Sequence, residues 1–128
     1  MSEECHPVID HEYLDELRHW VGQATLVELA EIAPEMFGAE AGAVRQAWQQ
    51  GDVDALREAG HRLKGVASSL ACRRLASLGQ FIQHAPQEAA ADPDLGNRLS
   101  NEFEAALAAL AALFPPQPQA IPVPPRPQ

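Results

Sequence analysis

One histidine and one lysine, a single helical turn apart, carry the most distinctive chemistry in this sequence. A neutral imidazole is a good nucleophile near neutral pH, so His61 could accept a phosphoryl group if one ring nitrogen is exposed. Lys64 could then stabilise the arriving oxygens and the charge that develops during transfer. Gly65, next in the chain, would leave a gap in the side-chain surface through which another protein could bring a carboxyl phosphate. This combination predicts a phosphoryl-accepting site.

The helix expected over residues 52–70 decides which way this site faces. At 100° per residue its apolar side chains and one glycine gather on one side: Val53, Leu56, Gly60, Leu63, Val66, Ala67 and Leu70. His61 falls opposite this stripe, on one line with Lys64, Gly65 and Ser68, so we expect it to be exposed. A glycine inside a helix costs about 1 kcal/mol relative to alanine, and packing propensity does not explain why Gly60 and Gly65 flank the histidine.

The remaining elements also have helical periodicity, and no strand-like alternation is present. We expect six helices, over residues 10–20, 23–33, 35–50, 52–70, 73–85 and 93–114. Pro34 should interrupt the chain between the second and third helices, and Asp92-Pro93 should open the last one. The predicted fold is all-α. The last four helices would form an antiparallel four-helix bundle, and the first two would cover one end.

The residues around His61 resemble those of a known family, the histidine-containing phosphotransfer (HPt) domains of bacterial multistep phosphorelays. The family motif is matched in register by His61, Leu63, Lys64, Gly65, Ala67, Leu70 and Leu75, and the resemblance extends over roughly residues 8–113. Ala71 and Cys72 depart from the usual Gly and Ala, which could alter the turn between two helices. Val66 replaces a frequent Ser. The resemblance also implies that Gln83 accepts a hydrogen bond from the imidazole N–H, leaving Nε2 to attack, although a solvated glutamine is an equal alternative.

The same resemblance implies a function. His61 would be phosphorylated and would shuttle the phosphoryl group between aspartates of receiver domains, the partners being response regulators and a hybrid sensor histidine kinase. The chain would have no cofactor of its own, because the receiver supplies the Mg²⁺. It would be a phosphotransfer intermediate and not an enzyme. No phosphate-cradling loop or other nucleotide site is visible in the sequence.

Charge is distributed unevenly along the chain. The net charge is −9, but residues 57–74 carry five basic residues against the single acid Glu58, which leaves +4 there and −13 elsewhere. An acidic chain should repel nucleic acid, so we expect the basic residues to attract an acidic protein surface toward His61. The predicted partner-binding residues are Arg57, Arg62, Gly65, Ser68 and Arg73. The alternative is that these arginines are ordinary solvent-exposed side chains of a helical hairpin and bind no partner.

Composition and length predict one domain. We expect a flexible N-terminus over residues 1–7, the helical bundle over residues 8–114 and a Pro-rich disordered tail over residues 115–128, to which we assign no function. No signal peptide or apolar stretch near 18 residues occurs, which predicts a cytoplasmic protein without membrane contact. Cys5 and Cys72 fit no zinc or redox spacing. A monomer is expected.

Two other classes of function fit parts of the pattern. Glu16-x-x-His19 and Glu58-x-x-His61 form half of the ligand set of a di-iron carboxylate bundle, but those side chains would have to point inward, and the apolar stripes turn them outward. The other alternative is a helical interaction module, a scaffold or an inhibitor, in which His61 is never phosphorylated. The presence of Lys64 and Gly65 argues against it.

Overall fold

The computed structural model describes residues 6–115, so the segments 1–5 and 116–128 lie outside the described part of the chain. Most of the predicted flexible N-terminus and Pro-rich tail falls in those segments. Within residues 6–115 there are six helices and no strand: α1 (His11–Val21), α2 (Gln23–Gln50), α3 (Val53–Ser68), α4 (Arg73–His84), α5 (Pro86–Ala91) and α6 (Leu95–Leu113). The all-α prediction is confirmed.

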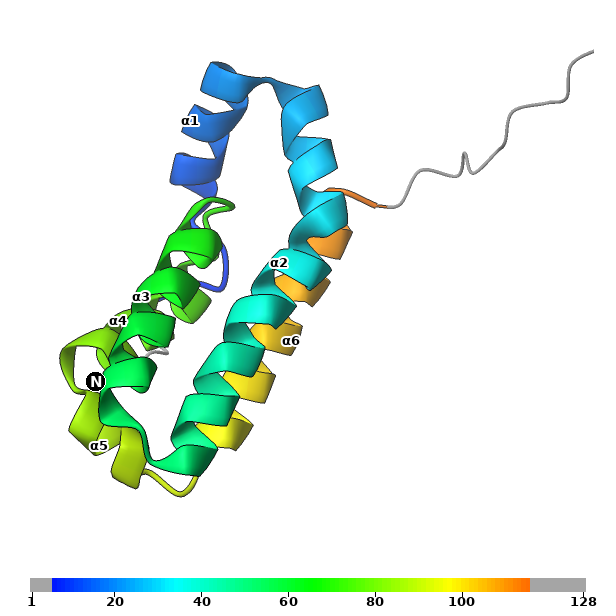
Figure 1. Ribbon diagram of the computed structural model, residues 1–128. Helices are drawn as coiled ribbons and strands as arrows, with labels where there is room; N and C mark the ends of the chain where they lie inside the picture. Colours follow the sequence, from blue (N-terminus) through cyan, green and yellow to red (C-terminus); the bar gives the residue numbers. More distant parts are fainter. Residues whose placement is uncertain (1–5, 116–128) are drawn as a thin grey trace, which may run out of the picture.

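Four of these helices form the bundle (Figure 1). α2 runs the length of the molecule with α6 alongside it, while α3 and α4 form an antiparallel hairpin that packs against them. α1 folds back along the N-terminal half of α2 at one end, and the short α5 lies at the other. The largest fully buried side chains come from every helix except α5 and from the turn between α3 and α4: Phe37, Leu14, Leu26, Leu56, Leu63, Leu70, Leu75, Leu78, Ile82, Leu95, Leu99 and Val44.

The expected break at Pro34 is wrong, because α2 continues through it from Gln23 to Gln50. The proline is exposed, and buried residues lie on both sides of it, Leu26 before and Phe37 after. An interior proline costs about 3 kcal/mol, whereas burying a leucine or phenylalanine contributes about 1.5–3 kcal/mol each. A single apolar face that spans the proline therefore keeps the helix continuous.

Local capping sets where α3 begins. Gly51 adopts a left-handed conformation (φ 68°) that ends α2, and the Asp52 carboxylate accepts a hydrogen bond of 3.1 Å from the N–H of Ala55. The break expected between the helices over residues 35–50 and 52–70 is confirmed. The helix ends at Ser68, two residues earlier than expected, so Leu70 packs into the core from the turn.

The segment before the last helix differs from the prediction. α6 begins at Leu95 after Asp94, and the Asp92 carboxylate instead accepts from the N–H of Asp94 at 2.8 Å, stabilising a turn. The carbonyl of Asp92 accepts a 3.0 Å hydrogen bond from the indole of Trp48. α5 was not predicted. It forms because Pro86 is compatible with the first turn of a helix, and both Pro86 and Ala89 are buried.

Candidate functional site

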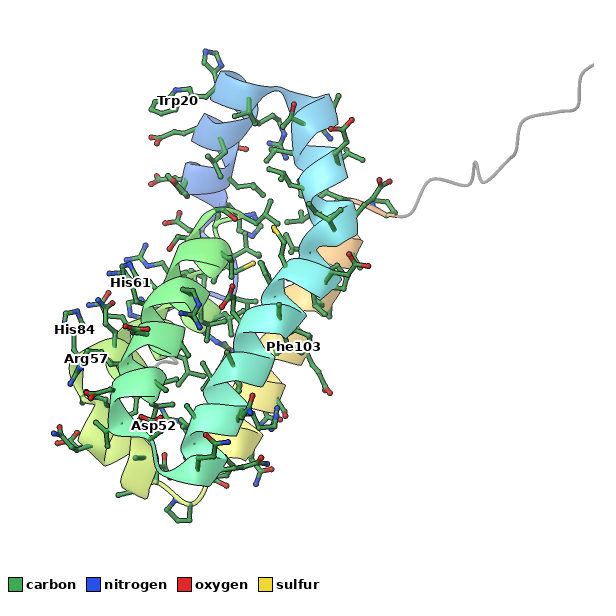
Figure 2. All side chains as sticks on the ribbon, in the orientation of Figure 1. Trp20, Asp52, Arg57, His61, His84 and Phe103 are labelled. Carbon is green, nitrogen blue, oxygen red and sulfur yellow. The ribbon has the colours of Figure 1, made fainter. Side chains whose placement is uncertain are left out.

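His61 is exposed on the outer face of α3. The helix buries Leu56, Leu63 and Ala67, which fixes its rotation and turns His61 to solvent, as the apolar stripe predicted. Figure 2 shows His61 projecting from the α3–α4 hairpin on the same side as Arg57 and His84. An imidazole in this position is accessible to a second protein.

The two glycines beside His61 have different surroundings. A Cβ atom on Gly65 would meet nothing within 4 Å, so the expected gap next to the imidazole is present. A Cβ on Gly60 would lie 2.7 Å from Cγ2 of Ile82 and 2.9 Å from the carbonyl oxygen of Gly79. The expectation that packing does not explain Gly60 is therefore wrong. Gly60 and Gly79 allow the backbones of α3 and α4 to approach closely.

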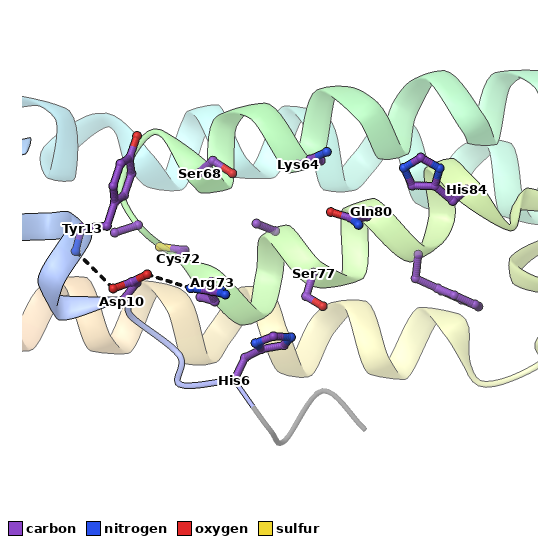
Figure 3. A pocket seen from close by; sticks show the side chains of 13 residues that line it. His6, Asp10, Tyr13, Lys64, Ser68, Cys72, Arg73, Ser77, Gln80 and His84 are labelled. Carbon is purple, nitrogen blue, oxygen red and sulfur yellow. Dashed lines mark hydrogen bonds and ion pairs between the residues drawn. The ribbon is translucent and has the colours of Figure 1, made fainter. Parts of the chain in front are cut away.

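Lys64 and Ser68 face α4 across an open cavity of about 760 Å³ (Figure 3). We call this cavity the α3–α4 groove; its lining residues also include Arg73, Ser77, Gln80 and His84 from α4. Of this α4 wall, the sequence analysis predicted Arg73 but missed Ser77, Gln80 and His84. The signal was available, because residues 73, 77, 80 and 84 follow a helical stripe opposite the apolar face of α4.

Gln83 lies on α4 beside the residue that precedes His61. Its backbone nitrogen is 2.9 Å from the position that a Cβ on Gly60 would occupy. Its side-chain Oε1 is buried and has no hydrogen-bond partner among the described residues. The predicted hydrogen bond to the imidazole is thus not formed, and the Gln83 side chain keeps a buried acceptor that no described residue uses.

The comparisons with known proteins place these residues in a family. The family model described as the Hpt domain matches residues 35–112, well over half of the chain. The chain belongs to the Hpt domain family. No curated protein and no solved structure matches it. Hpt domains are histidine phosphotransfer intermediates of phosphorelays, with receiver domains as their partners.

The matched region of this Hpt domain contains every predicted site residue. It covers α3, α4, α5, the second half of α2 and all but the last residue of α6. α1 and the first twelve residues of α2 lie outside it. These two segments form the end of the molecule that extends beyond the bundle in Figure 1.

The basic residues of this Hpt domain are mostly paired within the chain. Each arginine between positions 57 and 74 has a carboxylate partner: Arg57–Asp54 at 3.0 Å, Arg62–Glu40 at 2.9 Å, Arg73–Asp10 at 2.8 Å and Arg74–Glu102 at 3.1 Å. Lys64 has no ion pair among residues 6–115. The excess of positive charge predicted from residues 57–74 is therefore reduced by acids from outside that window. Arg62 lies closer to His61 in sequence but is paired with Glu40. Lys64 can therefore bind a phosphoryl group without first breaking an ion pair.

Two titratable groups near the groove have shifted pKa values. A hydrogen bond from the backbone N–H of Tyr13, together with the Arg73 guanidinium, lowers the pKa of Asp10. Burial raises the pKa of the Cys72 thiol to about 12. Cys72 is fully buried and unpaired, so it acts as a packing residue and not as a reactive thiol.

The candidate metal ligands do not converge. Glu16, His19, Glu58 and His61 are all exposed, whereas a di-iron bundle needs them inside. Among residues 6–115, no three His, Cys, Asp or Glu side chains gather in a way that could hold a metal ion. None of the helices in this range is long and apolar enough to cross a membrane.

Proposed function

We propose that His61 accepts a phosphoryl group from an aspartyl phosphate on one receiver domain and passes it to an aspartate on another. The observation that carries the proposal is the open surface at His61. It combines an exposed imidazole, an empty space at Gly65 and, on the same helical stripe, Lys64, whose ammonium forms no ion pair with any residue of the described range 6–115. Family membership supports the reaction class.

The chemistry is a reversible substitution at phosphorus. The lone pair of His61 Nε2 attacks the phosphorus atom, the bond from phosphorus to the aspartyl oxygen breaks, and the carboxylate leaves with that electron pair. The product is a phosphoramidate. No proton has to move in this step, because the imidazole keeps its Nδ1–H and becomes positively charged. The reverse reaction on a second receiver regenerates the neutral ring.

Lys64 and Gln83 have separate roles in this proposal. The ammonium of Lys64 stabilises the phosphoryl oxygens as charge builds up on them. Gln83 Oε1, which is buried and has no hydrogen-bond partner in the described part of the chain, would accept a hydrogen bond from Nδ1–H of His61. That bond orients the ring and favours the form in which Nε2 carries the lone pair. The side chains would have to reorient to form it, because the bond is absent from the structure.

The remaining assignments concern partners and place of action. We propose receiver domains of response regulators and a hybrid sensor histidine kinase as partners, with Mg²⁺ bound by the receiver. Arg57, Arg62 and Arg73 would exchange their exposed ion pairs for carboxylates of the receiver, which costs little because exposed pairs contribute only about 0–1 kcal/mol each. The protein would act in the cytoplasm as a monomer.

The experiment that tests the function follows a labelled phosphoryl group. A phosphorylated receiver panel is incubated with the wild-type chain, with His61→Gln and with His84→Gln, a control histidine that is also exposed on the same side. We expect acid-labile, base-stable label on the wild type and on His84→Gln, and none on His61→Gln. All three should have the same helicity. Label retained on His61→Gln, or absent from the wild type with every receiver, would favour the unphosphorylated interaction module.

A further inference from the structure

Gly60 and Gly79 fix how α3 and α4 are aligned. A Cβ on Gly60 would meet α4 between the carbonyl oxygen of Gly79 and the backbone nitrogen of Gln83, at 2.9 Å from each. A Cβ on Gly79 would meet α3 between the carbonyl oxygen of Gly60, at 2.8 Å, and the backbone nitrogen of Lys64, at 2.7 Å. Each glycine is therefore level with the middle of the stretch that it contacts, residue 60 with about residue 81 and residue 79 with about residue 62.

This alignment brings Gln80 to the level of His61. Because α3 and α4 are antiparallel, one residue forward on α3 corresponds to one residue back on α4. His61 is therefore level with Gln80 to within about one residue, which is about 1.5 Å of rise along a helix. The two side chains also start from neighbouring backbones, because the glycines bring the helices into direct contact.

Both side chains leave the hairpin on the same side. His61 follows Gly60 and Gln80 follows Gly79, so each is turned by about 100° from the line of contact between the helices. In two antiparallel right-handed helices, such turns lead to the same face of the pair. Both residues are exposed. Figure 3 shows Gln80 at the edge of α4 that borders α3, where it lines the α3–α4 groove with Lys64.

The side-chain amide of Gln80 is available for a new hydrogen bond. It makes none with any residue of the described range 6–115, and it offers two N–H donors. Gln83, about one turn further along α4, instead keeps a buried acceptor. The two glutamines therefore suit different groups: the buried oxygen of Gln83 suits a ring N–H, and the exposed N–H of Gln80 suits an anionic oxygen outside the ring.

We propose that Gln80 is a further catalytic residue, whose side-chain N–H donates a hydrogen bond to an oxygen of the phosphoryl group on His61. This inference rests on the proposed function. The phosphoryl group would lie between the ammonium of Lys64 on α3 and the amide of Gln80 on α4. The bond from Nε2 to phosphorus forms and the bond from phosphorus to the leaving group breaks, while no proton passes to or from the amide. A donor aimed at oxygens that gain charge in the transition state lowers the barrier.

The test compares substitutions that keep, remove or reverse the donor. Gln80→Lys keeps a donor, Gln80→Ala removes it, and Gln80→Glu puts a carboxylate of nearly the same shape in its place. We expect phosphorylation of His61 to be at least tenfold slower in Gln80→Glu, about threefold slower in Gln80→Ala and within about twofold of the wild type in Gln80→Lys. The matched control is Gln46→Glu, which makes the same change in charge at an exposed residue of α2, on the side opposite the buried Phe37. Its rate should equal that of the wild type.

Two phosphoryl donors separate contact with the phosphoryl group from contact with the receiver. One is a phosphorylated receiver, and the other is phosphoramidate, a small molecule whose P–N bond breaks with release of ammonia. We expect the same order of rates with both donors. An NMR measurement needs no rate: the side-chain amide signals of Gln80 should shift when His61 is phosphorylated, and should stay unchanged in His61→Gln treated in the same way.

Three results would overturn the role of Gln80. Equal rates for Gln80→Glu and Gln46→Glu would show that the amide does not contact the phosphoryl group. Slower transfer from the receiver alone would assign Gln80 to receiver binding. Amide signals that do not change on phosphorylation would exclude the hydrogen bond. Label on wild-type His61 supports the proposed function whatever the variants do, whereas a wild type that takes no label from either donor contradicts that function and the role of Gln80 with it.

Discussion

Single residues around His61 divide into those that keep the site open and those that hold its helix in place. Gly65 leaves a space that nothing in the described structure fills, whereas Gly60 is in contact with α4. The two glycines are five residues apart on one helix. Replacing Gly65 should therefore stabilise the domain, whereas replacing Gly60 should destabilise it.

We expect Gly65→Gln to raise the free energy of unfolding by about 0.5–1 kcal/mol, because glycine is a poor helix former and the new side chain meets no obstacle. The same change should slow phosphoryl transfer by blocking the receiver's approach to His61. Gly60→Ala is the paired variant and should destabilise the domain by about 1–3 kcal/mol through its clash with Ile82 and the α4 backbone. Urea unfolding and a transfer assay measure both effects. If Gly65→Gln unfolds the bundle, the gap is a packing contact.

We expect Lys64→Ala to slow phosphorylation of His61 at least tenfold, equivalent to about 1.4 kcal/mol of activation free energy. Stability should change by no more than about 0.5 kcal/mol, since Lys64 has no ion pair among residues 6–115. Arg18→Ala is the control, because it also removes one positive charge, lies on α1 outside the predicted receiver-binding residues, and takes part in an exposed pair with Asp15. Single-turnover rates should separate the two variants. Equal rates would show that net charge, and not the position of Lys64, matters.

At the scale of elements, the turn between α3 and α4 depends on an unusual backbone conformation. Ala71 has φ 61°, the left-handed region that the family's usual glycine adopts readily and that costs an L-residue about 1–2 kcal/mol. The residue is buried, and its carbonyl accepts from the N–H of Asp10, so the turn also anchors the start of α1. This turn therefore holds an alanine in a conformation that favours glycine.

Substitutions at Ala71 should report this conformation. We expect Ala71→Val to lower the free energy of unfolding by about 2 kcal/mol or more, because a β-branched side chain at positive φ is strained and the site is already filled. Ala71→Gly relieves the strain but loses a buried methyl worth about 0.8 kcal/mol, so its stability should lie within about 1 kcal/mol of the wild type. Chemical denaturation of both variants is the measurement. A fully stable Ala71→Val would contradict a left-handed turn.

At the scale of the whole molecule, α1 is joined to the bundle by a few specific contacts. Ile9 and Leu14 are buried against the core, and Asp10 caps α1 while pairing with Arg73 on α4. These contacts link the end of the molecule outside the family match to the hairpin that carries His61. Of these contacts, the α1 cap and the ion pair with Arg73 should depend on the ionisation of Asp10.

The pKa of Asp10 is lowered by its hydrogen bond from the Tyr13 N–H and by Arg73. A lowered pKa means that this contribution to stability is present above the ordinary value of about 3.9 and is lost as the pH falls through the folded-state value. We expect stability to decrease more steeply below about pH 4 in the wild type than in Asp10→Asn, which can still cap α1 but does not titrate. Urea unfolding as a function of pH tests this. Identical slopes would remove Asp10 from the acid response.

Periodic features of the fold and site follow from the sequence alone. The rotation of α3 that exposes His61, the helix starts expected near residues 10 and 52, and the all-α class each depend on residues within a few turns of one another. Tertiary packing decided the rest: the continuity of α2 through Pro34, the contact between Gly60 and α4, and the acids that pair with the arginines. Spacing along a helix shows which residues share a face, but not how closely another helix approaches that face. That distance depends on residues far apart in the sequence, and it determined where the groove lined by Lys64 lies.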